Sequence, residues 1–396
     1  MTIKELVPKY QDYVRNLRRT FHQYPDLSYE EQETTKRIAA ELDKMGIPYE
    51  IDPEKNTGLV ATIKGGKPGK TVALRADIDG LPVKETNTFD FKSKRDGKMH
   101  ACGHDGHISI VLGAARMLMD MKDEIEGTVY LVFQPAEEVG TGALYMMRFG
   151  DWYEKTDCIF GGHVWIDVPA GKINVEPGPR MAGGDYFKIT VKGRSGHGSQ
   201  PNQALDAVVI SAAIIMNLQT VVSRHYNPLE SVVLTVGSVL SGNRFNIIAG
   251  DAVMEGTTRY FKPEIGPDLE KTMRRIVENT AEAYGAKAEL EYQYIVPVTS
   301  NYEEPTEVAR QAVKEVMGEE ALAPMRMTAG GEDFSFYLQH KPGCFMFPGI
   351  YNADPKFDAT HSHHSHNFNM DDTYLSAASG VYAQTAIDWL KKHNKD

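Results

Sequence analysis

Residues 99–107, with the sequence MHACGHDGH, form the stretch around which the rest of this chain is organised. This stretch combines one thiol, three imidazoles and one carboxylate, from Cys102, His100, His104, His107 and Asp105. Two intervening glycines allow the backbone to turn tightly between these side chains. Thiolates and imidazoles at this density suit a transition metal such as Zn, Mn, Co or Ni. The alternative is a loop that is His-rich by chance, but ligand-type residues are rarely so dense outside metal sites. The stretch therefore predicts a metal centre.

Composition and charge narrow the class of protein. The chain has 396 residues, which usually means two or more domains, and its formal net charge of −11 argues against a nucleic-acid surface. Its three cysteines are too few and too far apart for a disulfide framework. The first residues lack the apolar core of a signal peptide, and the longest apolar stretch, 208–216, is far shorter than a membrane span. We expect a cytoplasmic protein with neither a nucleic-acid partner nor a membrane partner.

Strands alternate with helices on both sides of the metal-ligand stretch. The pattern predicts helices over 3–24 and 34–45 and strands over 57–64, 70–77, 128–134 and 158–161. Such alternation indicates an α/β fold with a mixed, mostly parallel sheet flanked by helices. Functional sites in such sheets form at the carboxyl ends of the strands. We therefore expect convergence of the polar residues that follow the predicted strands, namely Asp77, Glu137, Glu138 and His163.

The pattern changes beyond residue 183. Strands are predicted over 185–192, 232–239, 251–259 and 287–296, with helices over 204–225 and 267–284. The order βαββαβ describes a self-contained two-layer domain, which we place at 184–294 as an insertion. Residues 1–183 and 295–396 then form one discontinuous metal-binding domain. Its last part carries a second His-rich run, HSHHSH at 361–366.

The side chains of the predicted site allow metal-assisted hydrolysis of an amide or ester. Cys102 and His104 are two apart, so they can share one metal ion or bridge two. Glu137 and Glu138 are adjacent, so one can bind metal while the other stays free as a general base. With His163 and one histidine of the HSHHSH run, the ligands are too many for one tetrahedral ion and suit two close ions. Each residue alone also has a structural interpretation, such as a solvated glutamate pair or a turn-capping aspartate.

Six segments resemble motifs of the aminoacylase-type dinuclear metallopeptidase family, most closely those of its N-acyl-L-amino acid amidohydrolase branch. They cover almost the whole chain and read RRTFHQYPDLSYEE (18–31), LRADIDGLPV (74–83), MHACGHDGH (99–107), FQPAEE (133–138), GRSGHGSQP (193–201) and GGEDFSFY (330–337). The resemblance implies a zinc-peptidase-like catalytic domain that binds two divalent metal ions per subunit. It also implies that the inserted domain acts as a lid and pairs with its copy in a homodimer.

The resemblance assigns site residues position by position. It implies that Cys102 bridges the two ions and that the other metal ligands are His104, Glu138, His163 and His364. It makes Glu137 the general base, Asp77 a support for the metal centre, and His197 the residue that stabilises the tetrahedral intermediate. The substrate-holding positions correspond to Asn246, Arg259, Gly330 and Gly331. The last motif departs from the family pattern by reading HSHNFNMDD at 364–372, which leaves His363 as an alternative to His364.

Three functions stay open from the sequence. The first is an amidohydrolase that releases a carboxylic acid and a free amino acid from a small N-acyl amino acid. The second is a dipeptidase or carboxypeptidase with the same chemistry. The third is a non-catalytic metal-binding protein, against which the presence of Glu137 argues, because an inactive relative often loses its base.

Overall fold

The structure, a computed structural model, describes residues 1–394 and divides into two compact units. Unit 1 comprises Met1–Gly178, Ser300–Arg326 and the chain from Asp333 onward. Unit 2 comprises Pro179–Thr299 together with Met327–Glu332. The chain passes between the units at four positions, and two of them lie in the short strands β8 (Gly178–Met181) and β15 (Thr299–Asn301).

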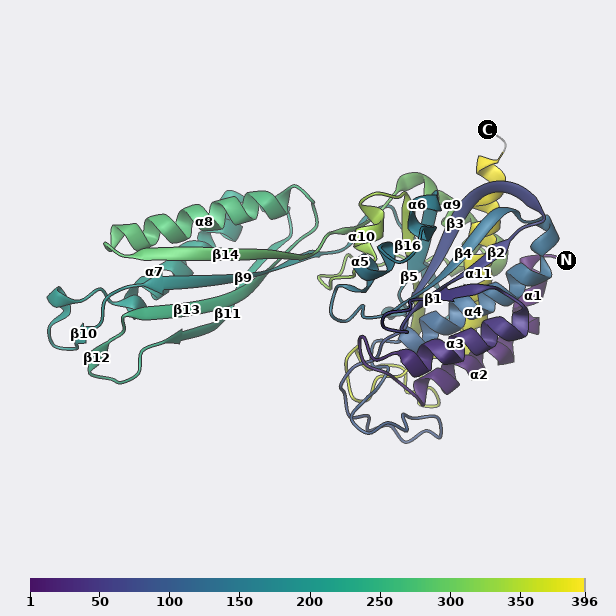
Figure 1. Cartoon of the computed structure of the whole chain (residues 1–396), viewed down its shortest axis with the longest axis horizontal. Helices are drawn as coiled ribbons and strands as arrows, with labels where there is room; N and C mark the ends of the chain where they lie inside the picture. The colour runs from purple at the N-terminus through teal and green to yellow at the C-terminus, as the bar shows by residue number, and fades with distance from the viewer. Residues whose placement is uncertain (395–396) are drawn as a thin grey trace. The chain divides into compact units, whose positions relative to one another are not determined.

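Unit 1 is built on a mixed sheet of eight strands in the order β1-β2-β4-β3-β5-β16-β6, with β7 paired to β16 (Figure 1). The strands β4, β3, β5, β16 and β6 run parallel, while β1 and β2 form an antiparallel edge. The predicted mixed, mostly parallel sheet is thus confirmed. The strand bounds are β1 (Tyr49–Ile51), β2 (Leu59–Lys64), β3 (Lys67–Asp77), β4 (Glu126–Gln134), β5 (Cys158–Gly162), β6 (Trp165–Pro169), β7 (Ile173–Asn174) and β16 (Gly343–Tyr351).

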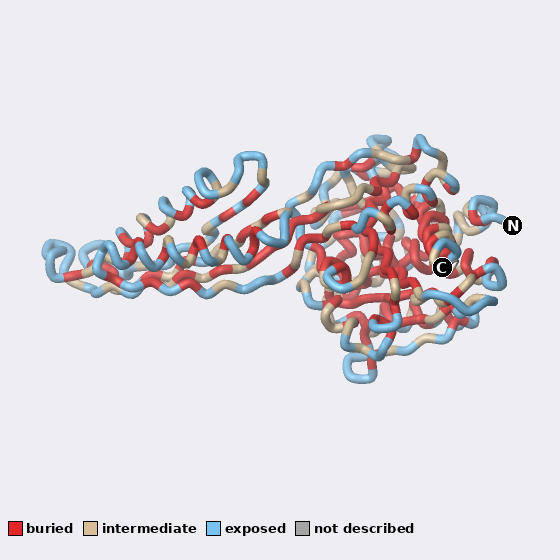
Figure 2. Tube along the Cα trace, turned by 90° about the horizontal axis from the view of Figure 1, so that it is seen from above, coloured by how far each residue is buried: buried red, intermediate tan, exposed pale blue. Residues whose placement is uncertain are grey.

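Helices flank this sheet, and two of them, α4 and α11, pack against β3 and against each other. The helix α4 is almost wholly buried, which matches its largely apolar sequence. Figure 2 shows that the buried residues of unit 1 gather in its interior. The helices are α1 (Ile3–Lys9), α2 (Gln11–His22), α3 (Gln32–Met45), α4 (His104–Asp120), α5 (Gly142–Met147), α6 (Trp152–Lys155), α9 (Glu303–Met317), α10 (Ser335–Leu338) and α11 (Leu375–His393).

Two features of unit 1 differ from the sequence prediction. The single helix expected over 3–24 is broken at Tyr10 into α1 and α2. Pro8 lies inside α1, and its missing N–H and its ring disfavour continuation of the helix. The interior strand β16 was not predicted, because its sequence GCFMFPGIY has no alternation and contains one proline and two glycines.

Unit 2 is a four-stranded antiparallel sheet in the order β11-β13-β9-β14, with α7 and α8 packed on it. The chain order is the predicted βαββαβ, and the helices and the sheet enclose a separate hydrophobic core. Unit 2 also contains a separate two-stranded antiparallel ribbon, formed by β10 and β12. The bounds are β9 (Gly183–Lys192), β10 (Gly196–His197), α7 (Ala207–Thr220), β11 (Val232–Ser241), β12 (Ile247–Ile248), β13 (Asp251–Tyr260), α8 (Ile265–Ala283) and β14 (Lys287–Val296).

The observed bounds of unit 2 are wider than the predicted 184–294, and they include a segment that is remote in the sequence. Thr328 donates its N–H to the carbonyl of Arg180 at 3.0 Å, and Ala182 donates to the carbonyls of Thr328 and Gly330 at 3.1 and 3.0 Å. These backbone bonds tie Met327–Glu332 to the start of unit 2. Hydrogen bonds of this kind leave no periodic signal in the sequence.

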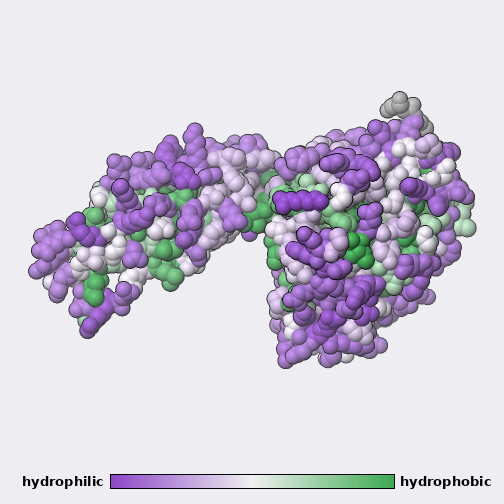
Figure 3. All heavy atoms as spheres, in the orientation of Figure 1, coloured by the Kyte–Doolittle hydropathy of each residue, from purple (hydrophilic) through white to green (hydrophobic). Residues whose placement is uncertain are grey.

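Ala207–His225 is the one helical segment of residues 1–394 that is long and apolar enough to cross a membrane by length and composition. One side of it packs in the core of unit 2 through Ala207, Ile210, Ile214 and Leu218. Other apolar residues of unit 2 are exposed, among them Met216, Leu240 and Phe245. Apolar residues interrupt the mostly hydrophilic surface in the view of Figure 3.

Candidate metal centre

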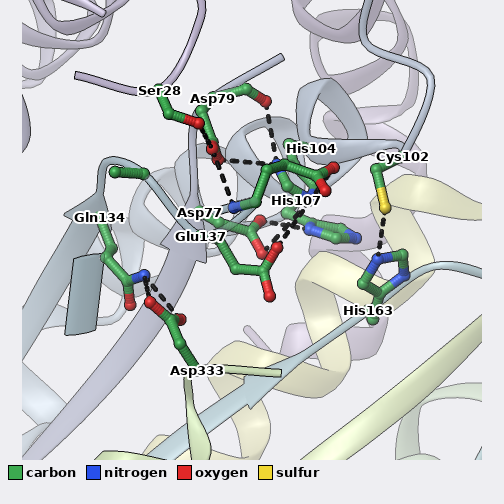
Figure 4. A network of polar contacts seen from close by, with 12 residues as sticks. Ser28, Asp77, Asp79, Cys102, His104, His107, Gln134, Glu137, His163 and Asp333 are labelled. Atoms are coloured by element: carbon green, nitrogen blue, oxygen red, sulfur yellow. Dashed lines mark hydrogen bonds and ion pairs between the residues drawn. The ribbon is translucent and has the colours of Figure 1, made fainter. Parts of the chain in front are cut away.

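The predicted ligands of unit 1 come together at the carboxyl edge of its parallel sheet (Figure 4). Asp77 ends β3, the pair Glu137 and Glu138 follows β4, and His163 follows β5. Cys102 lies just before α4, and His104 is the first residue of that helix. This is the convergence that the strand-end argument predicts.

Cys102 is shared by two groups of potential ligands. Its Sγ lies within 4.8 Å of donor atoms of His163 and His363 in one group, and of Glu138 and His364 in the other. The Sγ to His163 Nε2 distance is 3.2 Å. A donor shared between two adjacent groups is positioned as a bridging ligand would be.

His104 is oriented by Asp79. Its Nδ1–H donates to the main-chain oxygen of Asp79 at 2.9 Å and to Asp79 Oδ1 at 3.1 Å. The other oxygen of Asp79 accepts from Ser28 Oγ at 2.7 Å and from the N–H of Glu138 at 3.1 Å. With Nδ1 engaged, His104 Nε2 faces the carboxylates, 3.9 Å from Glu138 Oε1 and 4.0 Å from Glu137 Oε2. A histidine that binds a metal typically donates its other ring N–H to a carboxylate or carbonyl oxygen, as His104 does to Asp79.

His163 has the tautomer that a metal ligand needs. Its Nδ1–H donates to the carbonyl of Val164 at 2.6 Å, so Nε2 keeps its lone pair toward Cys102. Burial, together with the nearby His107 and His363, holds the pKa of His163 well below its usual value. The ring is therefore neutral and able to ligate.

The HSHHSH run brings two histidines to the site in different ways. His364 Nε2 lies 3.5 Å from Glu138 Oε2, and its backbone takes the left-handed conformation with φ +65°. The Nε2 of His363 instead accepts the N–H of Ile166 at 3.3 Å, while its ring packs against Trp165 and Phe368. This geometry favours His364 as the last ligand, with His363 beside it.

His107 and Asp77 form a hydrogen-bonded pair next to the candidate ligand His104. His107 Nδ1–H donates to Asp77 Oδ1 at 2.5 Å, and His107 Nε2 accepts the N–H of Val164 at 2.8 Å. Both nitrogens are thereby used, so His107 is not free to ligate a metal. Asp77 Oδ2 also accepts from Arg75 at 2.8 Å and lies 3.7 Å from His104 Nε2. Asp77 is therefore fixed between Arg75 and His107, next to His104.

The chemistry of the donor set fits a cation. His104 Nε2 and Glu138 Oε1 are buried and have no hydrogen-bond partner within residues 1–394. Burial, followed by repulsion from Glu138, raises the pKa of the Cys102 thiol well above its usual value. Burial likewise raises the pKa of Glu138 to about 7. A metal ion would compensate the thiolate and the carboxylate together, and we infer that these residues are preorganised to hold one or more.

The predicted residues of unit 2 fall into two separate places. His197 lies in β10, which pairs with β12 beside Asn246, and the carbonyl of Asn246 accepts the N–H of Gly198 at 3.0 Å. The N–H of Ser199 donates to His197 Nδ1 at 3.2 Å, which leaves the proton on Nε2 as a donor. Arg259 lies at the other end of β13, where it pairs with Gly184.

Gly330 and Gly331 belong to the segment that is bound to the start of unit 2. The carbonyl of Gly330 accepts from Ala182, as described above, and a Cβ on Gly331 would lie 2.7 Å from a side-chain carbon of Val296. Both glycines therefore lie near the Gly184 end of the sheet, with Arg259, and not near His197.

Sequence reasoning gave no role to several residues that the structure places around the site. Asp79 follows the same strand as Asp77, so the strand-end rule already pointed to it. Gln134 is the last residue of β4, and Asp333 lies in the GGEDFSFY segment. Nothing in the local sequence indicates that these two side chains meet.

Comparison with known proteins agrees with this geometry. The model of peptidase family M20/M25/M40 matches residues 73–388. An N-acetylcysteine deacetylase of Bacillus subtilis is 38% identical over 372 residues, covering 94% of this chain and 95% of that protein. A thermostable carboxypeptidase of Saccharolobus solfataricus is 38% identical over 393 residues and covers 98% of both chains. The crystal structure of a Bacillus subtilis protein described as a dinuclear metal binding peptidase has a TM-score of 0.86, with 34% identity, over 97% of this chain and 99% of that one. The chain therefore belongs to peptidase family M20/M25/M40 and is a metal-dependent hydrolase of amide bonds.

Proposed function

We propose that this protein hydrolyses the amide bond of small N-acyl-L-amino acids to a carboxylic acid and a free amino acid. The observation that carries the proposal is the group of buried donors around Cys102, with the carboxylate of Glu137 beside it. The overall similarity to an N-acetylcysteine deacetylase supports the same substrate class. Family membership sets aside the non-catalytic alternative.

The proposed ligands are Cys102, His104, Glu138, His163 and His364, which would hold two divalent ions with Cys102 between them. When bound, such ions polarise the substrate carbonyl and lower the pKa of a water molecule. Zn, Mn, Co and Ni all suit this mixture of thiolate, imidazole and carboxylate. Asp79 holds the donor ring of His104 in place before a metal arrives, and Asp77 holds His107, which supports the site without binding metal.

Glu137 is the proposed general base. Its side chain is largely buried, with 10% of its surface exposed, and its Oε2 lies 4.0 Å from His104 Nε2. A carboxylate at this position can take a proton from the attacking water and return it to the departing amine nitrogen. Glu138, the neighbouring carboxylate, faces Cys102 and His364 and is left to bind metal.

Two distant places in unit 2 support a shared active site in a homodimer. The strand β13 runs from Asp251, paired with Lys192, to Arg259, paired with Gly184. These eight steps correspond to about 26 Å. His197 and Asn246 lie beyond the Asp251 end (Figure 1). A small N-acyl amino acid cannot contact Arg259 and His197 of the same chain.

We therefore propose that each active site uses Arg259, Gly330 and Gly331 of one subunit and His197 and Asn246 of the other. Arg259 would bind the substrate carboxylate, for which a guanidinium is well suited. The Nε2–H of His197 would donate to the oxyanion that forms when water attacks the carbonyl. Exposed apolar residues of unit 2, such as Leu240, provide surface that a second copy can cover.

A carboxypeptidase is the second candidate. The similarity to the Saccharolobus solfataricus carboxypeptidase extends over 98% of both chains at the same 38% identity. The chemistry of the metal centre is the same for both reactions, and an arginine can bind the carboxylate of either substrate. The two candidates differ only in the group on the other side of the scissile amide.

A substrate panel with defined metals tests the proposal. Metal content is measured first by elemental analysis. The protein loaded with Zn, Mn, Co or Ni is then assayed on N-acetyl and N-benzoyl amino acids beside dipeptides and N-blocked dipeptides. We expect about two ions per chain and the highest kcat/KM on an N-acyl amino acid. A higher kcat/KM on peptides for every metal would replace the proposal with the second candidate.

A further inference from the structure

The loop that carries Glu137 and Glu138 is folded tightly on itself. It leaves β4 after Gln134 and enters α5 at Gly142. Ala136 takes the left-handed conformation with φ +56°, and its carbonyl accepts the N–H of Gly142 at 3.1 Å. A Cβ on Gly142 would lie only 1.7 Å from the carbonyl oxygen of Pro135. The loop therefore has little freedom as long as its two ends stay together.

One carboxylate, that of Asp333, holds both ends of this loop. Gln134, before the loop, donates its Nε2 to the two oxygens of Asp333 at 2.8 and 2.9 Å. Ala143, after the loop, donates its N–H to Asp333 Oδ2 at 2.8 Å. Figure 4 shows Asp333 facing Gln134, with Glu137 between them and the histidines. These bonds add to the backbone bond from Gly142 to Ala136, which closes the turn within the loop.

The same carboxylate connects the loop to Asp77. Arg75 donates to Asp333 Oδ1 at 2.9 Å, to Asp77 Oδ2 at 2.8 Å and to Gln134 Oε1 at 2.9 Å. The side chains of Arg75, Asp77 and Asp333 are fully buried. A carboxylate oxygen of Asp333 also lies within 4.8 Å of one of Glu137. The buried Arg75 guanidinium thus forms ion pairs with two carboxylates, those of Asp77 and Asp333, next to Glu137.

We propose that Asp333 is a positioning residue for Glu137, acting through Gln134 and Ala143 at the ends of the loop and through Arg75. The inference rests on the proposed role of Glu137 as the base. Donors from three residues converge on the two oxygens of Asp333, and a carboxylate offers only acceptors to them. An asparagine would turn its own N–H groups toward at least one of these donors. Depending on which way the amide faces, the bond to Arg75 or the bond to Ala143 is lost, together with one of the two contacts of Gln134, so the loop is held less firmly.

The first test is Asp333→Asn. A displacement of about 1 Å at the reacting groups costs on the order of 10²-fold in rate, so we expect kcat to fall ~10–100-fold. KM and the number of metal ions per chain should stay close to the wild-type values, because the bonds described above join Asp333 to Arg75, Gln134 and Ala143, none of which is a proposed metal ligand or substrate-holding residue. Assays use whichever amide substrate the wild-type protein cleaves best.

Asp371→Asn is the matched control. Asp371 is also buried in unit 1, at 2% exposure, and accepts the N–H of Thr373 at 2.9 Å and the Nδ2 of Asn352 at 2.7 Å. It therefore has a similar mixture of backbone and amide donors without a link to Glu137. This control should keep kcat, and equal losses in the two variants would overturn the proposal.

A double-mutant cycle with Glu137→Gln separates positioning from a general structural effect. If Asp333 acts through Glu137, Asp333→Asn should cost little further kcat once Glu137 is already glutamine. Full additivity would overturn the inference while leaving the base role of Glu137 intact. A normal kcat in Glu137→Gln alone would instead overturn the proposed function.

A second variant covers the case in which Asp333→Asn does not fold. Gln134→Met keeps the volume of the side chain but removes its bonds to Asp333 and Arg75. We expect it to lower kcat ~10-fold or more with metal content unchanged. Circular dichroism monitors folding. Unfolding of both variants, or normal kcat in either folded one, would overturn the role of Asp333 as a positioning residue.

Discussion

The candidate functional residues of the two units differ in how far they are buried. In unit 1, His104 and Asp77 are fully buried, and each of them is held by hydrogen bonds from neighbouring side chains. In unit 2, His197 and Asn246 are exposed at the end of a short ribbon. The proposed metal site is thus shaped in advance by its own unit, whereas the proposed oxyanion donor lies at a surface.

This difference follows from what each group must bind. A metal site binds its ion more tightly when the ligands are already oriented, and the ion itself offsets the cost of deprotonating them. Burial and fixed histidine tautomers therefore favour metal binding. A donor to a transient oxyanion is needed only when the substrate is present, and it can be brought there by a second subunit or by closure of a lid. The predictions below test each half of this comparison, beginning with the largest expected effect.

Cys102→Ala should have the largest effect. If the thiolate bridges two ions, the variant should lose at least one ion per chain, and activity should fall by ~10⁴-fold or more because both metal functions fail. Elemental analysis and turnover rates measure the two effects. Cys158→Ala is the control, since Cys158 is also buried in unit 1 but lies on β5. Full metal occupancy in Cys102→Ala would reject the bridging role.

Glu137→Gln and Glu138→Gln should separate the roles of the adjacent carboxylates. Glutamine at 137 cannot accept the proton of the attacking water, so kcat should fall ~10²–10⁴-fold while metal content is kept. Glutamine at 138 should instead lower metal content, because this carboxylate faces Cys102 and His364. Metal loss in the first variant, or retained metal with normal kcat in the second, would mean that the two assignments are wrong.

The contrast between the units also explains how much the sequence could predict. The strand ends at Asp77, Glu137 and His163 were located correctly because buried parallel strands are short apolar runs followed by polar residues. The unit 2 order βαββαβ was predicted because its half-exposed strands and the amphipathic helix α8 carry clear periodicity, while α7 is a long apolar run. Such signals are local.

What the sequence could not predict depends on contacts between remote residues. The strand β16 lies inside the sheet, between β5 and β6, and nearly all of its residues are buried, so no alternation marks it. Asp333 meets Gln134 across 199 positions of the chain, and only the fold brings them together. The exclusion of His107 from the ligand set likewise depends on the N–H of Val164, which the spacing within MHACGHDGH cannot reveal.

His197→Ala tests the exposed half of the comparison. Removal of one oxyanion donor should lower kcat ~10²–10³-fold with metal content intact. Ser199→Ala is a milder companion, since Ser199 only holds the His197 ring through Nδ1 at 2.8 Å. A normal kcat for His197→Ala would show that His197 does not stabilise the transition state.

Mixing two inactive variants tests whether His197 acts across a dimer. Glu137→Gln and His197→Ala are combined under conditions that exchange subunits. If His197 serves the partner's site, each mixed dimer has one intact site and one doubly altered site, so activity returns toward half the wild-type value. If His197 serves its own chain, every site keeps one lesion and no activity returns. The second outcome would reject the shared site but not the role of His197 in catalysis.

The smallest effect concerns a buried histidine behind the metal centre. His22 Nδ1–H donates to Asp105 Oδ2 at 2.8 Å, and Nε2–H donates to Glu85 Oε1 at 3.1 Å. Although burial acts to lower it, the pKa of His22 is raised, chiefly by Asp105. His22→Gln should lower the free energy of unfolding at pH 6 by about 2 kcal/mol, the scale of a hydrogen bond to a charged group. Urea unfolding curves of the two proteins measure this difference.

The pH dependence of that difference distinguishes a charged His22 from a neutral one. A folded-state pKa above the unfolded value of about 6.5 means that the stabilisation is fully present below pH 6.5 and is lost as pH rises through the folded pKa. The gap between wild type and His22→Gln should therefore shrink from pH 6 to pH 9. His225→Gln in unit 2 is the control, since His225 lies 2.9 Å from Asp268 at a partly exposed position, where a pair contributes at most ~1 kcal/mol. A gap for His22 that stays constant with pH would mean that Asp105 and Glu85 hold a neutral ring, and that the buried cation paired with Asp105 is Arg18, which donates to Asp105 Oδ2 at 3.0 Å, rather than His22.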